Sequence, residues 1–193
     1  MCPRLKIAFA AALLGAASLA GLYASAETIT FSGQPISGGP PFVSDTEGSF
    51  TVTPFTGVFS VGDTFGDPVP DLYLSQSTAT IQVTLTDGGD FTFSSIDLAS
   101  FPVSDGSYQL VGLLNNIQQF SAGGPLPGTG TFLNYNPGVS SDLIDSLRIT
   151  LTSPFAESDL DNIVVNPIPE PSSLLLLATG SLAAAGAIRR RSI

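Results

Sequence analysis

Hydrophobic and polar residues alternate along much of this chain, most clearly at residues 48–54, 78–86, 90–98 and 147–152. Alternation with a period of two predicts antiparallel strands that bury one face and expose the other. No long stretch between residues 27 and 166 has the apolar periodicity of an amphipathic helix. We therefore expect the middle of the chain to consist of strands.

A hairpin and several shorter runs complete this pattern. Asn115-Asn116 separates the runs 109–114 and 117–120, and asparagine tolerates the positive φ of a tight hairpin turn. Residues 157–165 predict a turn that leads into a last strand. Weaker strands are expected at 28–32, 57–61 and 130–135, with Gly/Pro-rich loops at 33–41, 62–71 and 123–128. About nine or ten strands at this spacing predict an all-β fold, a single antiparallel β-sandwich.

The first residues have the pattern of a secretory signal peptide. Arg4 and Lys6 precede an apolar run at residues 7–22, and Ala24-Ser25-Ala26 supplies small residues at a cleavage site, with Ala24 and Ala26 in the two positions that matter. We predict a signal helix within residues 1–26, and the alternative is a retained N-terminal anchor. Cys2, the single cysteine, would leave with the signal, so the mature chain would contain no disulfide.

The last residues form a second distinct segment. Residues 172–188 carry no charge, and as a helix they would span ~25 Å, at the short end of what crosses a bilayer core. Arg189, Arg190 and Arg191 follow at once, and such a cluster stays in the cytoplasm. Pro169-Glu170-Pro171 precedes the apolar run and disfavours helix there.

The order and spacing of these pieces resemble the PEP-CTERM sorting signal of Gram-negative bacteria. The resemblance covers residues 167–193, and the alternative is an ordinary C-terminal anchor behind a Pro-rich linker. It implies recognition of Pro169, Glu170 and Pro171 by an exosortase, a membrane protease, with residues 172–188 as transmembrane helix and Arg189–Arg191 as membrane stop. It further implies an inner-membrane precursor that passes through the secretion machinery and reaches the cell surface or the exopolysaccharide matrix.

The net charge of the region between these two segments limits the classes of partner that it can bind. Fifteen acidic residues lie between residues 27 and 168 against a single basic one, Arg148, which leaves a net charge of −14. Nucleic acid requires clustered Lys and Arg, so we exclude it as a partner. Divalent cations are the natural partners of such a surface.

The region 90–166 also resembles, through short motifs, the jelly-roll domains of PEP-CTERM proteins and of carbohydrate-binding modules. The motifs that support this resemblance lie at residues 91–97, in the hairpin at 108–120, and at residues 144–151 and 160–163. The resemblance implies a jelly-roll-like sandwich and polysaccharide as a partner. Candidate sugar contacts are Tyr73, Tyr108 and Tyr135, and the alternative is that each lies at the edge of the core with its hydroxyl in water. The chain has no Trp, the residue that such sites often use for stacking.

Catalytic chemistry is restricted by composition. The chain has no His, its Cys and Lys lie only in the signal segment, and catalytic triads and Schiff bases are therefore excluded. A carboxylate pair of the glycosidase kind survives as an alternative. We expect no enzyme.

Acidic residues that alternate in loops suggest a structural Ca²⁺ ion, because calcium takes carboxylate and carbonyl oxygens. The candidate ligands are Asp97, Asp159 and Asp161. The alternative is that Asp161 or Asn162 bonds its own backbone in a turn.

Thr-x-Thr pairs start, among other places, at residues 28, 51, 78, 84 and 150. Ice-binding faces repeat this pair at a regular interval, which the spacing here does not do. We interpret these threonines as solvent-facing strand positions. The sequence thus predicts a secreted, acidic, non-catalytic β-sandwich, and the runner-up is a carbohydrate-binding module.

Overall fold

The computed structural model describes residues 25–36, 38–63, 66, 69–101, 106–168 and 180. Ser25–Ile168 forms one compact unit. The predicted signal helix and, apart from Gly180, the predicted transmembrane helix at 172–188 lie outside the described residues. Within the described part of the chain, no helix is long and apolar enough to cross a membrane.

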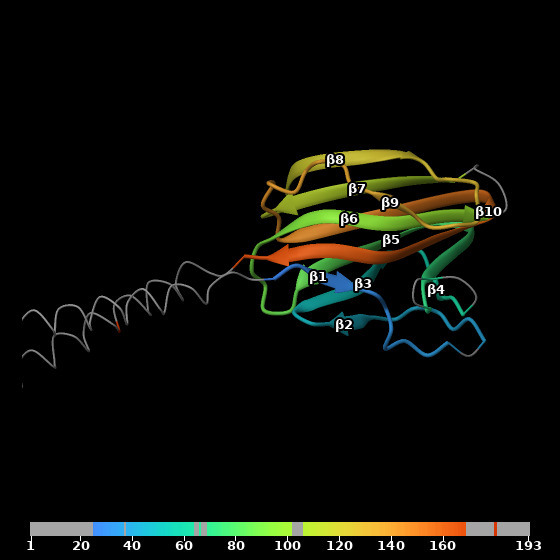
Figure 1. Cartoon of the computed structure of the whole chain (residues 1–193), viewed down its shortest axis with the longest axis horizontal. Helices are drawn as coiled ribbons and strands as arrows, with labels where there is room; N and C mark the ends of the chain where they lie inside the picture. The colour runs from blue at the N-terminus through green and yellow to red at the C-terminus, as the bar shows by residue number, and fades with distance from the viewer. Residues whose placement is uncertain are drawn as a thin grey trace, which may run out of the picture. The chain divides into compact units, whose positions relative to one another are not determined.

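The unit is a sandwich of two antiparallel sheets that share two long strands, β5 and β10 (Figure 1). The first sheet has the order β2 (Asp45–Glu47), β3 (Phe50–Thr56), β5 (Leu72–Leu85), β10 (Ser146–Pro167), β7 (Ser107–Leu114) and β8 (Ile117–Pro125). The second sheet has the order β4 (Ser60–Val61), β5, β10, β6 (Phe91–Phe101) and β9 (Leu133–Tyr135), with β1 (Glu27–Ile29) also paired to β10.

A bulge lets β5 and β10 pass from one sheet to the other. Three residues of β10 between Ser153 and Glu157 stand opposite one residue of β5 between Ser77 and Ser75. The surplus residues bend the strand and increase its twist. Before the bulge β10 pairs with β7, and after it β10 pairs with β6.

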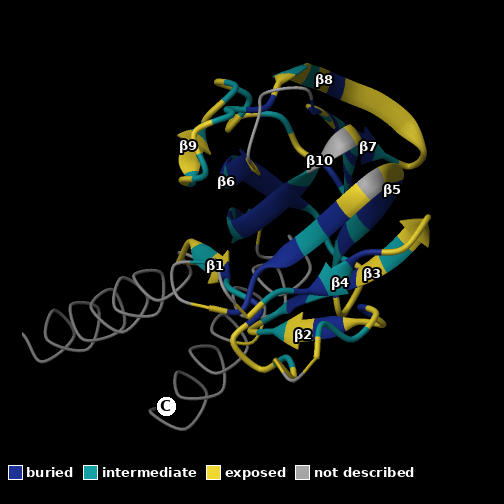
Figure 2. Cartoon of the chain, turned by 90° about the vertical axis from the view of Figure 1, so that its right-hand side faces the viewer, coloured by how far each residue is buried: buried dark blue, intermediate teal, exposed yellow. Residues whose placement is uncertain are grey.

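The core lies between the two sheets and consists of aliphatic and phenylalanine side chains. The strand β6 is buried along most of its length (Figure 2). Phe50 and Phe91, both fully buried, meet edge to face with ring centroids 5.1 Å apart. Phe93 and Phe120 stack at 6.3 Å. Aromatic pairs in these geometries add to the stabilisation that comes from area burial.

The predicted antiparallel β-sandwich is confirmed. Each of the clear alternating runs lies in a strand, and the predicted hairpin is β7–β8, with φ of 53° at Asn115 and 63° at Asn116. The weaker candidates correspond to β1, β4 and β9.

Two local predictions were wrong. Residues 157–165 were predicted to be a turn that leads into a new strand, but they form the second half of β10. Their alternating acidic side chains lie on one face of this continuous strand, and the neighbouring strands β5 and β6 supply its backbone hydrogen bonds. The predicted loop at 123–128 begins inside β8, where Gly123 pairs with Gln109. An added Cβ at Gly123 would lie 2.7 Å from the carbonyl oxygen of Tyr108, so the glycine permits the close approach of the two strands.

Replacing Phe91 with alanine should lower the free energy of unfolding by about 3–5 kcal/mol, because it leaves a cavity against Phe50. Urea unfolding of the purified protein measures this loss. Phe101→Ala on the same strand is the matched control, since that ring is 45 % exposed, and its loss should be clearly smaller. Equal losses would contradict the placement of Phe91 in the core.

Candidate functional site

The outer face of the first sheet carries a continuous set of threonines. We call it the threonine face; it comprises Thr51, Thr53, Thr78, Thr80, Gln82, Thr84, Arg148, Thr150 and Thr152. Three of the Thr-x-Thr pairs, and the first threonine of a fourth, lie here on the neighbouring strands β3, β5 and β10. The hydroxyls of Thr80 and Thr150 are 2.8 Å apart, and Thr78 donates to Thr152 at 3.2 Å.

Arg148 stands near the middle of the threonine face. Its Nε donates to Gln82 Oε1 at 3.1 Å, and its guanidinium lies 3.9 Å from the ring centroid of Phe55. Phe55 lies within a register shift of β3, between Pro54 and Thr56, and is 49 % exposed. Sequence alone does not point to Phe55, because its neighbours show no aromatic pattern and only the register places it beside Arg148.

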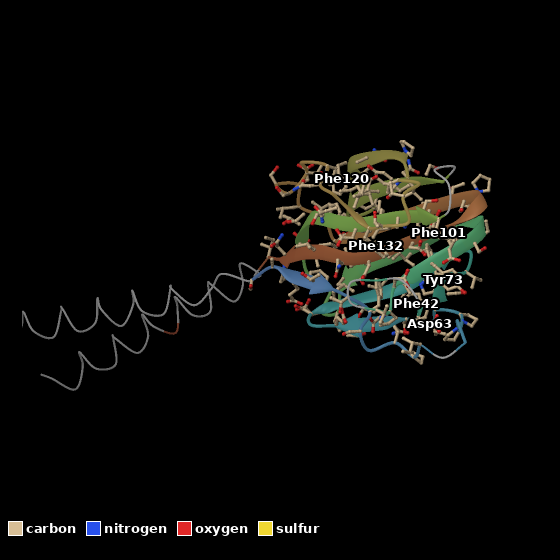
Figure 3. All side chains as sticks on the ribbon, turned by 45° about the vertical axis from the view of Figure 1, so that its right-hand side comes forward. Phe42, Asp63, Tyr73, Phe101, Phe120 and Phe132 are labelled. Carbon is tan, nitrogen blue, oxygen red and sulfur yellow. The ribbon has the colours of Figure 1, made fainter. Side chains whose placement is uncertain are left out.

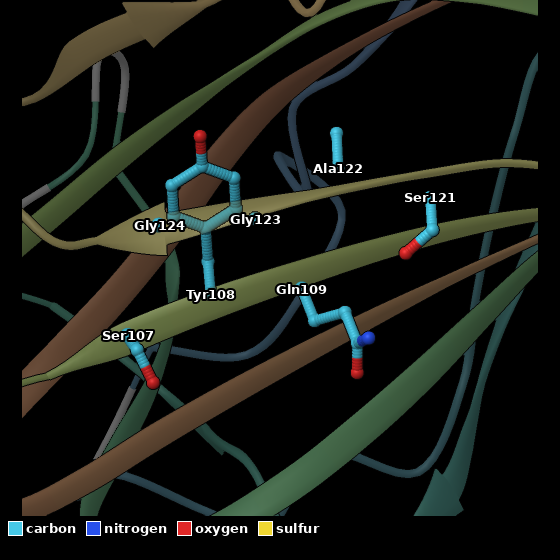
Figure 4. A pocket seen from close by; sticks show the side chains of 7 residues that line it. All are labelled: Ser107, Tyr108, Gln109, Ser121, Ala122, Gly123 and Gly124. Atoms are coloured by element: carbon cyan, nitrogen blue, oxygen red, sulfur yellow. The ribbon is translucent and has the colours of Figure 1, made fainter.

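An open pocket of about 290 Å³ lies beside the threonine face, on strands β7 and β8 (Figure 4). It is lined by Ser107, Tyr108, Gln109, Ser121, Ala122, Gly123 and Gly124. Ser107 and Gln109 stand opposite Thr152 and Thr150 of β10, so their side chains share the threonine face's side of the sheet. Tyr108 projects from the other side of β7 (Figure 4).

The three tyrosines predicted as sugar contacts do not form an exposed row. Tyr73, Tyr108 and Tyr135 are each half-buried. Tyr108 and Tyr135 pack against the core, with their ring centroids 5.0 Å apart. Burial, followed by the charge of Tyr108, raises the pKa of Tyr135. The aromatic ring available to a ligand on the threonine face is therefore Phe55.

Of the three predicted calcium ligands, Asp97 and Asp161 both accept hydrogen bonds from Asn162, while Asp159 has a different neighbour. Asp97 accepts from Asn134 Nδ2 at 2.7 Å and from Asn162 Nδ2 at 3.0 Å. Asp161, its register partner on β10, accepts from the backbone N–H of Asn162 at 2.8 Å, where the chain has a positive φ of 47°. This is the turn-like backbone bond that was the alternative to a metal. Across the described ranges, no three acidic side chains form a ready set of metal ligands.

Asp159, the third of these residues, faces Asp71 instead. We call Asp71 and Asp159 the acid pair. Each is 1 % exposed, and they lie on the side of the second sheet opposite Leu72 and Leu160. Asp63 and Tyr73 lie at the same end of the sandwich, where β4 pairs with the beginning of β5 (Figure 3). Asp71 was missed because it ends a Gly/Pro-rich segment that predicts only a loop.

Burial dominates the electrostatics of the acid pair. It raises the pKa of Asp159 from 3.8 to about 8, with further contributions from the charges of Asp71 and Glu157. The pKa of Asp71 rises to about 6 for the same first reason, although its backbone hydrogen bond and its contact with Asp159 oppose the rise. Burial also raises the pKa of Glu157. The three carboxyls therefore resist simultaneous ionisation.

The predicted sorting and cleavage residues lie largely outside the described residues. This holds for Ala24, for Pro169, Glu170 and Pro171, and for Arg189–Arg191, while Ala26 is exposed at the beginning of the described unit. The sorting segment begins where the sandwich ends. β10 runs to Pro167, and the next residue, Ile168, donates its backbone N–H to Asp90 at 2.9 Å.

A comparison with protein families finds a match at the C-terminal end of the chain. The model of the PEP-CTERM protein-sorting motif matches residues 167–191. The predicted sorting motif is thereby confirmed, and such a motif implies an exported protein. No curated protein matches the sequence.

Several solved structures have a similar arrangement of strands. The CBM22-1 xylan-binding domain of Paenibacillus barcinonensis Xyn10C is 14 % identical, covers 77 % of this chain and 97 % of its own, and gives a TM-score of 0.46. A family 29 carbohydrate-binding module from Piromyces equi is 10 % identical, with 76 % and 91 % covered and a TM-score of 0.44. A DUF4465 family protein from Bacteroides caccae is 10 % identical, with 73 % and 98 % covered and a TM-score of 0.42. At this level of similarity, the likenesses say nothing about what this chain binds.

The acid pair makes stability depend on pH. Its raised pKa values mean that the folded state holds protons more tightly than the unfolded state between pH 3.8 and about 8. In chelator, the free energy of unfolding should therefore fall as pH rises through this window and level off above it. Asp159→Asn should reduce the slope, measured by urea unfolding at a series of pH values. The exposed Asp87→Asn is the control, and an equal slope in both variants would contradict the assignment.

Proposed function

We propose that the chain is an exosortase substrate, and that its β-sandwich is delivered as a non-catalytic component of the cell surface or the exopolysaccharide matrix. In this proposal the secretion machinery exports a precursor, which the helix at residues 172–188 and Arg189–Arg191 hold in the inner membrane. Cleavage near Pro169-Glu170-Pro171 then frees the sandwich.

The position of the sorting motif carries this proposal. The motif matches residues 167–191, and β10 ends at Pro167. A cut beside Glu170 would remove the apolar segment without removing any residue of the sandwich. The proline-rich connection between them disfavours regular structure, which suits an extended substrate in a protease cleft.

A non-catalytic role is supported by the chemistry of the sandwich. Residues 27–168 contain no His, Cys or Lys, so the remaining catalytic option is a carboxylate pair. The acid pair, Asp71 and Asp159, is too buried for a sugar ring to reach, since each side chain is only 1 % exposed. A glycosidase needs its two carboxyls in an open cleft.

The runner-up function is binding of a matrix polysaccharide by the threonine face. Hydroxyl and amide groups there can donate to and accept from sugar hydroxyls. Phe55 offers an exposed aromatic ring, and Arg148 brings the single positive charge of residues 27–168 to the same place. The acidic surface of the rest of the domain repels acidic polysaccharides. A neutral polysaccharide therefore fits the threonine face, as does an acidic polysaccharide whose negative group binds Arg148.

Alanine at Pro169, Glu170 and Pro171 together should block processing. The precursor should then accumulate in the inner membrane, because the protease no longer recognises its substrate. Intact-mass measurement of membrane and surface fractions distinguishes the full precursor from a product that begins at Glu27 and ends near Glu170. Alanine at the adjacent Ser172 and Ser173 is the control, and normal release of the triple variant would overturn the sorting proposal.

Phe55→Ala should weaken polysaccharide binding by the threonine face roughly tenfold. A sugar that covers this exposed aromatic ring would gain on the order of 1–2 kcal/mol of binding free energy from the contact. Affinity electrophoresis in gels that contain β-glucan or alginate measures the retardation of the folded protein. Val43→Ala, which also shortens an exposed apolar side chain, is the control. If the wild-type protein migrates unretarded in both gels, polysaccharides of these two kinds are not its ligands.

A further inference from the structure

The acid pair is an unusual feature for a protein interior. Apart from the backbone N–H of Asp71 itself and the carboxyl of Asp159, neither carboxylate oxygen of Asp71 has a hydrogen-bond partner among the described residues, and Oδ1 of Asp159 has none beyond the pair. Both side chains are 1 % exposed, so water does not replace the missing donors at the surface. Buried carboxylates normally accept several hydrogen bonds or lie beside a cation.

No side-chain cation of the sandwich can neutralise the pair. Arg148 is the single basic residue of residues 27–168, and it is engaged with Gln82 and Phe55 on the first sheet. The charged groups that act on the pair are acidic as well, namely Glu157 on β10 and Asp63 after β4. Leaving two unpaired charges buried would be strongly destabilising.

The backbone around Asp71 leaves room for its carboxylate. Gly62 continues β4 and donates its backbone N–H to the carbonyl of Asp71 at 2.9 Å. A Cβ at Gly62 would lie only 1.9 Å from Asp71 Oδ1. Any side chain at residue 62 would therefore displace the carboxylate from its position beside Asp159.

We infer that the acid pair is a binding site for a divalent cation of the calcium type, with Asp71 and Asp159 as its first ligands. Two carboxylates offer up to four oxygens, and backbone carbonyls or water molecules would supply the others. Calcium takes six to eight oxygen ligands in flexible geometry, whereas zinc prefers the His and Cys that the sandwich lacks. An exported protein also meets calcium at the concentrations that extracellular sites use.

This site differs from the set predicted from the sequence. Asp97 and Asp161 are already held by amide groups of Asn134 and Asn162. Asp71 replaces them as the partner of Asp159, because strand register brings the beginning of β5 next to the second half of β10. The inference does not depend on the proposed function, since a cation site would stabilise the sandwich wherever it is delivered.

The test uses the full-length protein, purified in detergent and stripped with EDTA. Titration with CaCl₂ in a calorimeter should give one site per chain near neutral pH. Millimolar Ca²⁺ should raise the melting temperature by about 5–10 °C, because a ligand that binds only the folded state stabilises it.

Substitutions of single aspartates show whether Ca²⁺ binds at the acid pair or at other acidic residues. Asp71→Asn and Asp159→Asn should each abolish the calcium-dependent rise in melting temperature and, in EDTA, melt at or above the wild-type temperature. Asp97→Asn tests the set predicted from the sequence, and the exposed Asp87→Asn is the matched control; both should keep the full response.

Three results would overturn the inference. The first is an unchanged melting curve of the wild-type protein in Ca²⁺ and in EDTA, which would mean that the pair shares a proton and holds no metal. The second is calcium binding that survives both Asp71→Asn and Asp159→Asn. The third is loss of binding in Asp97→Asn alone. The wild-type comparison decides the matter even if one of the variants does not fold.

Discussion

The bend in β10 is the constraint on which the rest of the sandwich depends. This strand of 22 residues pairs with β5, β7, β6 and β1, and its bulge between Ser153 and Glu157 carries it from one sheet into the other. Because β5 follows the same path, the two sheets close over one core without a separate connecting element. Each half of β10 thereby presents a different outer surface.

Those two outer surfaces have opposite chemistry. The first half of β10 contributes Arg148, Thr150 and Thr152 to a nearly neutral face, where hydroxyl groups bond each other across strands. The second half contributes Glu157 and Asp159 to an acidic and largely buried cluster. In a domain with a net charge of −14, this separation leaves one surface on which an uncharged partner can lie without meeting carboxylates.

The two wrong local predictions have a common physical origin. Alternating acids at residues 157–161 and the glycines at 123–124 have the composition of turns, but a strand accepts both when neighbouring strands supply its hydrogen bonds. Asp159 and Asp161 are tolerated because side chains alternate along the strand and the apolar Leu160 still points into the core. Gly123 is tolerated because β7 needs the space of its missing side chain.

The sequence by itself determined the elements whose signals are local. Alternation located the main strands, Asn115-Asn116 located the hairpin, and the ordered pieces of residues 167–193 identified the sorting motif, since each signal needs only neighbouring residues. Tertiary structure alone decided which distant residues meet. The threonine pairs form one face, Phe55 lies under Arg148, and Asp71 faces Asp159 because strand register joins positions that are far apart in the chain. Register depends on the packing of the whole core, which no local pattern encodes.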